Sequence, residues 1–125
     1  MLSESRTELG KIAIGKEVIA TLAGAAAMEG YGLVGMASRR ITDGFVELLG
    51  QENWSRGVEV KIDGDNVHIT LHVIVNYGVR ISEVAKNVME RVKYAVEDVT
   101  GLKVARVDVH VQGVQIDMAR AGVKQ

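Results

Sequence analysis

Residues 57–76, GVEVKIDGDNVHITLHVIVN, decide the fold class. Apolar and polar residues alternate through both halves of this stretch, and Asp63-Gly64-Asp65-Asn66 separates the halves. A period of two is typical of strands with one apolar face, and an Asp-Gly pair is typical of a tight turn. We therefore predict a β-hairpin. Its apolar face, turned toward the core, is formed by Val58, Val60, Ile62, Val67, Ile69, Leu71, Val73 and Val75.

Two helical patterns flank this hairpin. Residues 16–28 carry apolar groups at helical intervals, and residues 81–100 carry an apolar stripe with intervals of three and four. Gly30 and Gly101 are the expected stop signals, and Ser82 is the expected N-cap of the second helix. Gly24, inside the first helix, indicates close packing of that helix on a sheet.

Three further segments have strand patterns: Lys11–Ile14 as a short edge strand, residues 30–37 as a glycine-rich strand, and residues 104–111 as the last strand. The order is β-α-β-β-β-α-β. Two striped helices and strands with one apolar face predict an α+β fold, a two-layer sandwich with a mixed or antiparallel sheet and both main helices on one face. The order of the strands in the sheet stays open.

The chain has 125 residues, which predicts a single domain. We expect a flexible N-terminus over residues 1–9, the domain over residues 10–114 and a C-terminal tail over residues 115–125. The connection from Ser38 to Arg56 is long, with a short helix near Phe45 to Leu49. We expect it to fold back over an open edge of the core. The alternative is a docking surface for a partner or a membrane interface, where Trp54 and Arg56 would fit.

Composition excludes several function classes. With no cysteine, the chain has no disulfide, thiolate nucleophile or iron-sulfur cluster. The net charge of -1, from 15 Lys plus Arg and 16 Asp plus Glu, argues against coating nucleic acid or an anionic membrane. The N-terminus lacks a secretory layout, and the uncharged runs are shorter than the roughly 20 residues of a membrane span. We expect a soluble cytoplasmic protein without a span.

The polar face of the predicted sheet is the main candidate interaction surface. Its candidates are Glu59, Lys61, His68, His72, Asp108 and His110, joined by Arg39, Arg40, Trp54 and Arg56 from the long connection. His68 and His72 cannot share a zinc ion, because four residues along a strand span about 13 Å. We expect solvated or interface histidines here, with no metal and no cofactor.

Other motifs lack the context that their chemistry needs. Gly30, Gly32 and Gly35 form a G-x-G-x-x-G, but they follow a helix and precede an irregular segment, unlike a dinucleotide turn. The same Gly32-x-x-Gly35 with Arg39-Arg40 is similar to the loop of KH RNA-binding domains, which is the alternative function. The serines lack an activating motif and no carboxylate pair is marked, so we predict no enzyme.

The pieces of sequence together resemble the alkaline-shock protein family, the envelope stress response proteins, and most closely its short, YloU-like branch. The resemblance runs from Gly10 to Val114. Its pieces are GKIAI at residues 10–14, GYGLVGM at 30–36, RGVEV at 56–60, VNYG at 75–78 and TGLKV at 100–104, followed by the valines of the last strand.

The resemblance implies a cytoplasmic protein, or one held at the membrane through a partner, that serves alkaline and cell-envelope stress homeostasis. It implies protein partners, including membrane-anchored ones, and it allows a homo-oligomer. It brings no catalytic residues, because the matching positions are glycines and core valines. Function carried over in this way is an expectation from family to member.

Overall fold

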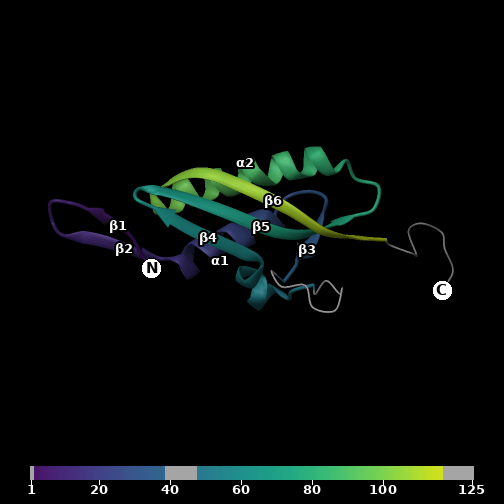
Figure 1. Cartoon of the computed structure of the whole chain (residues 1–125), viewed down its shortest axis with the longest axis horizontal. Helices are drawn as coiled ribbons and strands as arrows, with labels where there is room; N and C mark the ends of the chain where they lie inside the picture. The colour runs from purple at the N-terminus through teal and green to yellow at the C-terminus, as the bar shows by residue number, and fades with distance from the viewer. Residues whose placement is uncertain (1, 39–47, 117–125) are drawn as a thin grey trace.

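The computed structural model describes residues 2–38 and 48–116. The elements follow one another as β1 (Leu2–Arg6), β2 (Lys11–Gly15), α1 (Lys16–Met28), β3 (Leu33–Met36), the 3-10 helix η1 (Gln51–Gly57), β4 (Val58–Asp63), β5 (Asn66–Asn76), α2 (Ile81–Thr100) and β6 (Lys103–Gln115) (Figure 1).

The main sheet is built around β5. The hairpin strand β4 pairs antiparallel with the first half of β5, from Asn66 to Leu71, and β3 pairs antiparallel with Val73 to Val75. β6 pairs parallel with β5 along its whole length, so β3 and β4 share the opposite edge of β5. The predicted turn is present, with Gly64 at φ +61°. The mixed sheet confirms the predicted fold class and supplies the strand order that the sequence left open.

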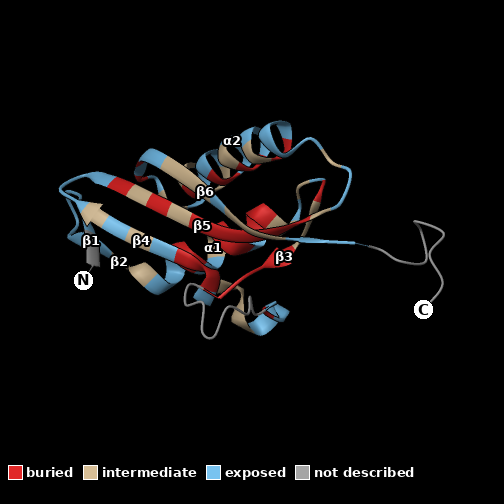
Figure 2. Cartoon of the chain, turned by 45° about the vertical axis from the view of Figure 1, so that its right-hand side comes forward, coloured by how far each residue is buried: buried red, intermediate tan, exposed pale blue. Residues whose placement is uncertain are grey.

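Both main helices lie on one face of this sheet, as predicted. On α2, Val84, Val88, Val92 and Val96 are buried against the sheet and α1. On β5 the apolar face is also buried, and Val67, Leu71 and Val73 are fully covered. Figure 2 shows the buried residues between the sheet and the helices. The core therefore lies between the sheet and the two helices, and neither helix covers the opposite face of the sheet.

The helix ends agree with the glycine signals but not with the predicted cap. Gly101 ends α2 with φ +76°, and its N–H donates to the Glu97 carbonyl at 2.9 Å. The N-cap of α2 is Arg80, whose carbonyl accepts from Glu83 and Val84, and no side chain caps this end. The prediction for Ser82 was wrong because the helix begins before it, at Ile81.

The N-terminal segment contains a strand where the sequence predicted a flexible lead-in. β1 pairs antiparallel with β2, and Thr7 and Gly10 exchange main-chain hydrogen bonds in the turn between them. Residues 11–14 are a strand as expected, but within the described residues this strand pairs with β1 and not with the main sheet. The described side chains of β1 are exposed, so no apolar periodicity marked it.

The connection from Ser38 to Arg56 differs from its prediction in detail. Part of the helix expected near Phe45 to Leu49 lies outside the described residues; Leu48 forms an antiparallel bridge with Ala37 and Leu49 is buried. The described helix is η1, which packs against α1. Gly24 therefore contacts Trp54 of η1, not a sheet as expected. The described part does fold back onto the core.

Candidate interaction face

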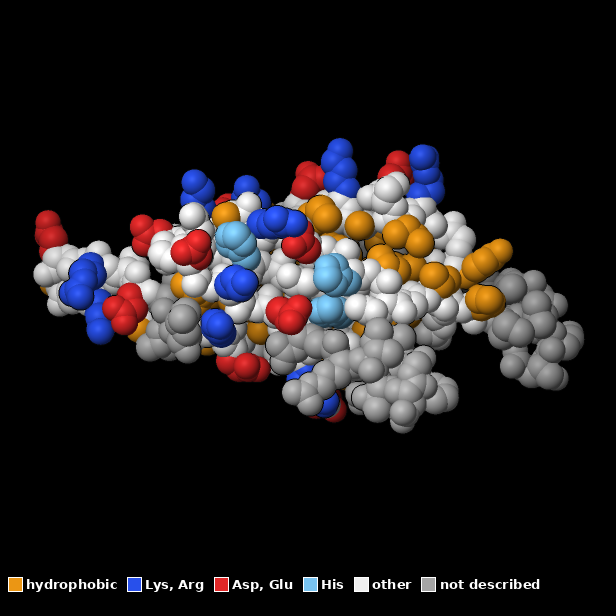
Figure 3. All heavy atoms as spheres, in the orientation of Figure 1, with side chains coloured by type: hydrophobic (Ala, Val, Ile, Leu, Met, Phe, Trp, Pro, Cys, Tyr) orange, Lys and Arg blue, Asp and Glu red, His pale blue; other side chains and the backbone are white. Residues whose placement is uncertain are grey.

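The open face of the sheet carries its polar side chains in rows set by the strand register. One row joins Lys61, His68 and Arg106, and the next joins Glu59, Thr70 and Asp108. The third row pairs His72 with His110. Figure 3 looks onto this side of the molecule, where charges of both signs and the histidines lie close together. We call these eight residues the open face.

His72 is the anchor of the open face. It is only 6% exposed, its Nε2 lies 3.1 Å from Glu59 Oε2, and its Nδ1 lies 2.8 Å from Gln112 Nε2. The amide nitrogen of Gln112 can only donate, so Nδ1 accepts and Nε2 carries the proton that His72 donates to Glu59. The His110 ring stands edge-on to His72, with centroids 5.1 Å apart. Both ring nitrogens are thus partnered, which makes His72 a fixed element of the surface.

Beside this anchor, the open face is more exposed and ionic. Arg106 Nε donates to both carboxylate oxygens of Asp108, at 2.9 and 3.0 Å. Both side chains are more than a third exposed, so this pair adds little stability. Lys61 forms no ion pair with any other described residue within 4.0 Å. Among the described residues, its ammonium is therefore available to meet an acidic group.

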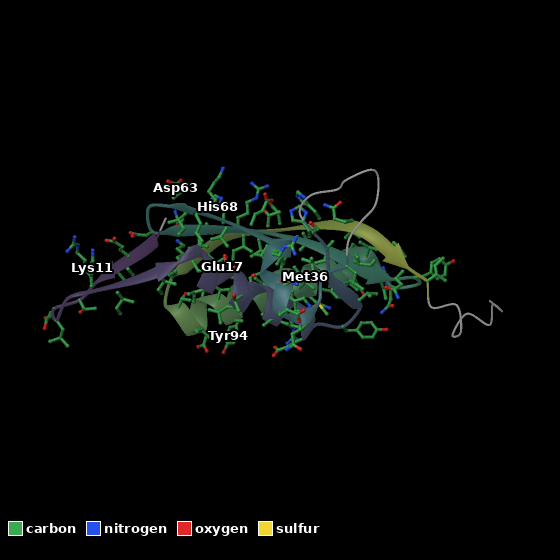
Figure 4. The ribbon with its side chains drawn as sticks, turned by 90° about the horizontal axis from the view of Figure 1, so that it is seen from below. Lys11, Glu17, Met36, Asp63, His68 and Tyr94 are labelled. Atoms are coloured by element: carbon green, nitrogen blue, oxygen red, sulfur yellow. The ribbon has the colours of Figure 1, made fainter. Side chains whose placement is uncertain are left out.

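A hollow of about 660 Å³ extends over this face and around the β4 edge of the sheet. It is lined by Lys61, His68, Arg106 and Asp108, and by Lys16 and Glu17 from the first turn of α1. Figure 4 shows Asp63 and His68 on the side of the sheet away from the helices, with Tyr94 on the helix side and Met36 between them. The hollow can offer several hydrogen bonds and ion pairs to a polar partner.

The structure brings most of the predicted site residues together. Glu59, Lys61, His68, His72, Asp108 and His110 share the open face, whereas Arg39 and Arg40 lie outside the described residues. Trp54 and Arg56 are part of η1, and Trp54 is half-buried against α1. The predicted surface therefore divides into the open face and a separate segment beside the helices.

Three residues of this site, Thr70, Arg106 and Gln112, were not among the predicted candidates. Arg106 completes the cationic row, and Gln112 holds the ring of His72. The alternation of the last strand places both on the polar face, which was the available signal. The parallel register places Arg106 opposite His68 and brings Gln112 to His72 of β5, and one sequence does not specify this register.

The described residues contain no group of three or more His, Cys, Asp or Glu side chains arranged to hold a metal ion. Among the helices in the described part of the chain, none combines the length and apolar character needed to cross a membrane.

Comparison with known proteins gives the family of this chain. The model of the alkaline-shock protein family, described by its "cell envelope-related function", matches residues 4–116. The chain belongs to this family, which confirms the resemblance found in the sequence and assigns the chain a cell-envelope-related function.

Several relatives support this membership. The uncharacterized protein YloU of Bacillus subtilis is 51% identical over 117 residues, covering 93% of this chain and 98% of YloU. Spy1614 of Streptococcus pyogenes is 41% identical over 93% of this chain and 97% of its own length. YqhY of Bacillus subtilis is 36% identical over 89% of this chain and 82% of its own length.

Among solved structures, MamM-CTD shows a weak likeness, with a TM-score of 0.47 and 14% sequence identity. The alignment covers 82% of this chain and 98% of that one.

Proposed function

We propose that the protein serves alkaline and cell-envelope stress homeostasis without catalysis, by binding other proteins in the cytoplasm through the open face. The partners include membrane-anchored proteins, which would bring the chain to the membrane. The observation that carries this proposal is the build of the open face. The strand register sets exposed charges of both signs in rows, and the buried, fully hydrogen-bonded His72 holds Glu59 in place among them.

The charge pattern favours a protein partner over RNA. Lys61 and Arg106 lie in one row with His68, and the carboxylates of Glu59 and Asp108 lie in the neighbouring row. A phosphate backbone that tracks a surface needs a continuous basic groove, and these carboxylates would repel it. A protein surface with its own alternating charges can pair with both signs, which gives specificity more than raw affinity.

The test swaps charges without changing their sum. In Lys61→Glu with Asp63→Lys, two exposed residues of β4 exchange sign, and we expect partners captured in the native host to be lost. A strain carrying this variant should grow as poorly at alkaline pH as a strain from which the gene is deleted. Its matched control is Lys86→Glu with Glu90→Lys, the same exchange on the exposed side of α2. Retention of partners and growth by the β4 variant would refute the proposal.

A further inference from the structure

The outer edge of β6 is an open strand edge. β6 runs from Lys103 to Gln115 and pairs with β5 on one side, and no described strand pairs with its other side (Figure 1). Such an edge presents unpaired N–H and C=O groups, and proteins usually cover it or block it with proline or lysine. The chain has no proline, and in β6 the single lysine is Lys103 at its first position.

The apolar side of this edge is incompletely covered. Val107, Val109 and Val111 pack against the core but remain partly exposed, whereas their neighbours on β5 are at most 1% exposed. Those neighbours are Ile69, Leu71 and Val73. Pairing a further strand with β6 would remove water from the three valines, and each Å² of apolar surface so buried contributes about 25 cal/mol.

The register irregularities of β6 define where such pairing can occur. The pairing with β5 shifts at Ala105 and at Gln112, so Arg106 to Val111 is the regular part of the strand. An antiparallel pair of two identical strands has a two-fold axis, and residues that face each other must point to the same side of the sheet. The number of paired residues within the regular part is greatest when the axis lies at Asp108 or at Val109, so that this residue faces its own copy.

Charge selects between these two registers. An axis at Asp108 places the two Asp108 carboxylates opposite each other and Arg106 opposite His110, which is unfavourable. An axis at Val109 places Asp108 opposite His110 of the second copy, and Val107 opposite Val111. This register joins a carboxylate to an imidazole twice and keeps the valines together on the other face.

We propose that β6 pairs antiparallel with β6 of a second copy of this chain, with Val109 of both copies at the two-fold axis. The two sheets then form one continuous sheet, and the two open faces lie on the same side of it. This self-association goes beyond the proposed function, and its test measures mass and cross-linking, so it succeeds or fails independently of partner capture.

A cysteine placed at the axis tests the register directly, because the chain contains none of its own. Facing Cα atoms in an antiparallel pair are about 4.5–5.5 Å apart, within disulfide range. We expect Val109→Cys to give a disulfide-linked dimer on mild oxidation. The matched control is Ala105→Cys, exposed on the same strand, whose copies would lie about 26 Å apart in this register. Equal cross-linking of both variants would overturn the proposal.

Two measurements complete the test. An equimolar mixture of Asp108→Cys and His110→Cys should form the mixed disulfide in preference to either self-linked dimer. Light scattering of the unmodified chain should give twice its mass of 13.5 kDa. His110→Asp, which brings carboxylates together, should raise the dimer dissociation constant about ten-fold. A single-chain mass at high micromolar concentration, or a dimer that Val109→Cys does not cross-link, would overturn the proposal.

Discussion

Trp54 packs its Cβ atom and main chain directly onto Gly24 of α1. A Cβ atom on Gly24 would lie 3.2 Å from Trp54 Cβ and 3.5 Å from the Trp54 carbonyl carbon and oxygen. Glycine in a helix costs about 1 kcal/mol relative to alanine, and the close approach of η1 explains why it stands here. This contact attaches η1, at the end of the long connection, to α1.

We therefore expect Gly24→Leu to destabilise the fold by about 1–3 kcal/mol, because the new side chain must displace Trp54. Trp54 is the only tryptophan, so its fluorescence should shift to longer wavelength as it is exposed. Urea unfolding measures the first effect. Lys86→Leu, at an exposed position of α2, is the control and should change neither quantity appreciably. Wild-type stability and emission in Gly24→Leu would contradict the importance of this contact.

Glu59 is expected to stabilise the fold through His72. Glu59→Ala removes the acceptor at 3.1 Å from the buried Nε2–H, and an unsatisfied buried donor costs about 1–3 kcal/mol. Glu59 is itself exposed, so water can replace part of the bond and we expect a loss near the lower limit. Glu59→Gln keeps an acceptor and should lose less. Lys61→Ala, two residues along the same strand, should be neutral in the same urea titration; equal losses in all three variants would speak against a specific role.

Gly57 is required by a close main-chain approach. A Cβ atom at this position would lie 2.6 Å from the Ala37 carbonyl oxygen and 3.1 Å from Met36 Cβ. Because the main chain at Ala37, directly after β3, cannot move aside alone, we expect Gly57→Ala to cost more than about 3 kcal/mol, the upper range of overpacking. Circular dichroism during thermal unfolding measures this loss. Gly50→Ala, where the nearest atom is a flexible Glu52 oxygen at 3.4 Å, should unfold close to wild type.

Glu97 connects the end of α2 to the start of β6. Its Oε2 accepts from the Val104 N–H at 2.9 Å, and Val104 is fully buried. Glu97→Ala leaves this buried donor unpaired, so we expect a loss of about 1–3 kcal/mol. Asp98→Ala, the exposed neighbour, should be within about 0.5 kcal/mol of wild type. Hydrogen exchange at the Val104 amide should accelerate in Glu97→Ala and not in Asp98→Ala.

Local patterns predicted the parts of the fold that depend on local physics. The hairpin of β4 and β5 was predictable because a period of two and an Asp-Gly turn act within a few residues. The stripe of Val84, Val88, Val92 and Val96 was predictable for the same reason, since a helix repeats its face every turn. The polar face of the sheet followed from these same alternations.

The remaining features depend on contacts between distant segments. His68 and His72 have the same place in the alternation, yet only His72 is buried, and Gln112 from β6 forms a hydrogen bond to its ring. The close approach of Gly57 to Ala37 brings together two segments separated by the long connection, and no sequence pattern in either segment indicates this contact. The η1 helix and β1 have no apolar period, so propensity alone did not indicate them.

The pairing of β3, β4 and β6 with β5 has a consequence for synthesis on the ribosome. Among the described strands of the main sheet, every pair includes β5, which begins at Asn66, just past the middle of the chain. During translation, β3 and β4 emerge before the strand that they need. At about 5–20 residues per second, the apolar face of α1 then waits several seconds without a sheet to cover it. Nascent chains that stop before Asn76 should therefore be protease-sensitive and bound by chaperones. In longer nascent chains, α1, β3 and β4 should become protease-resistant at the same chain length.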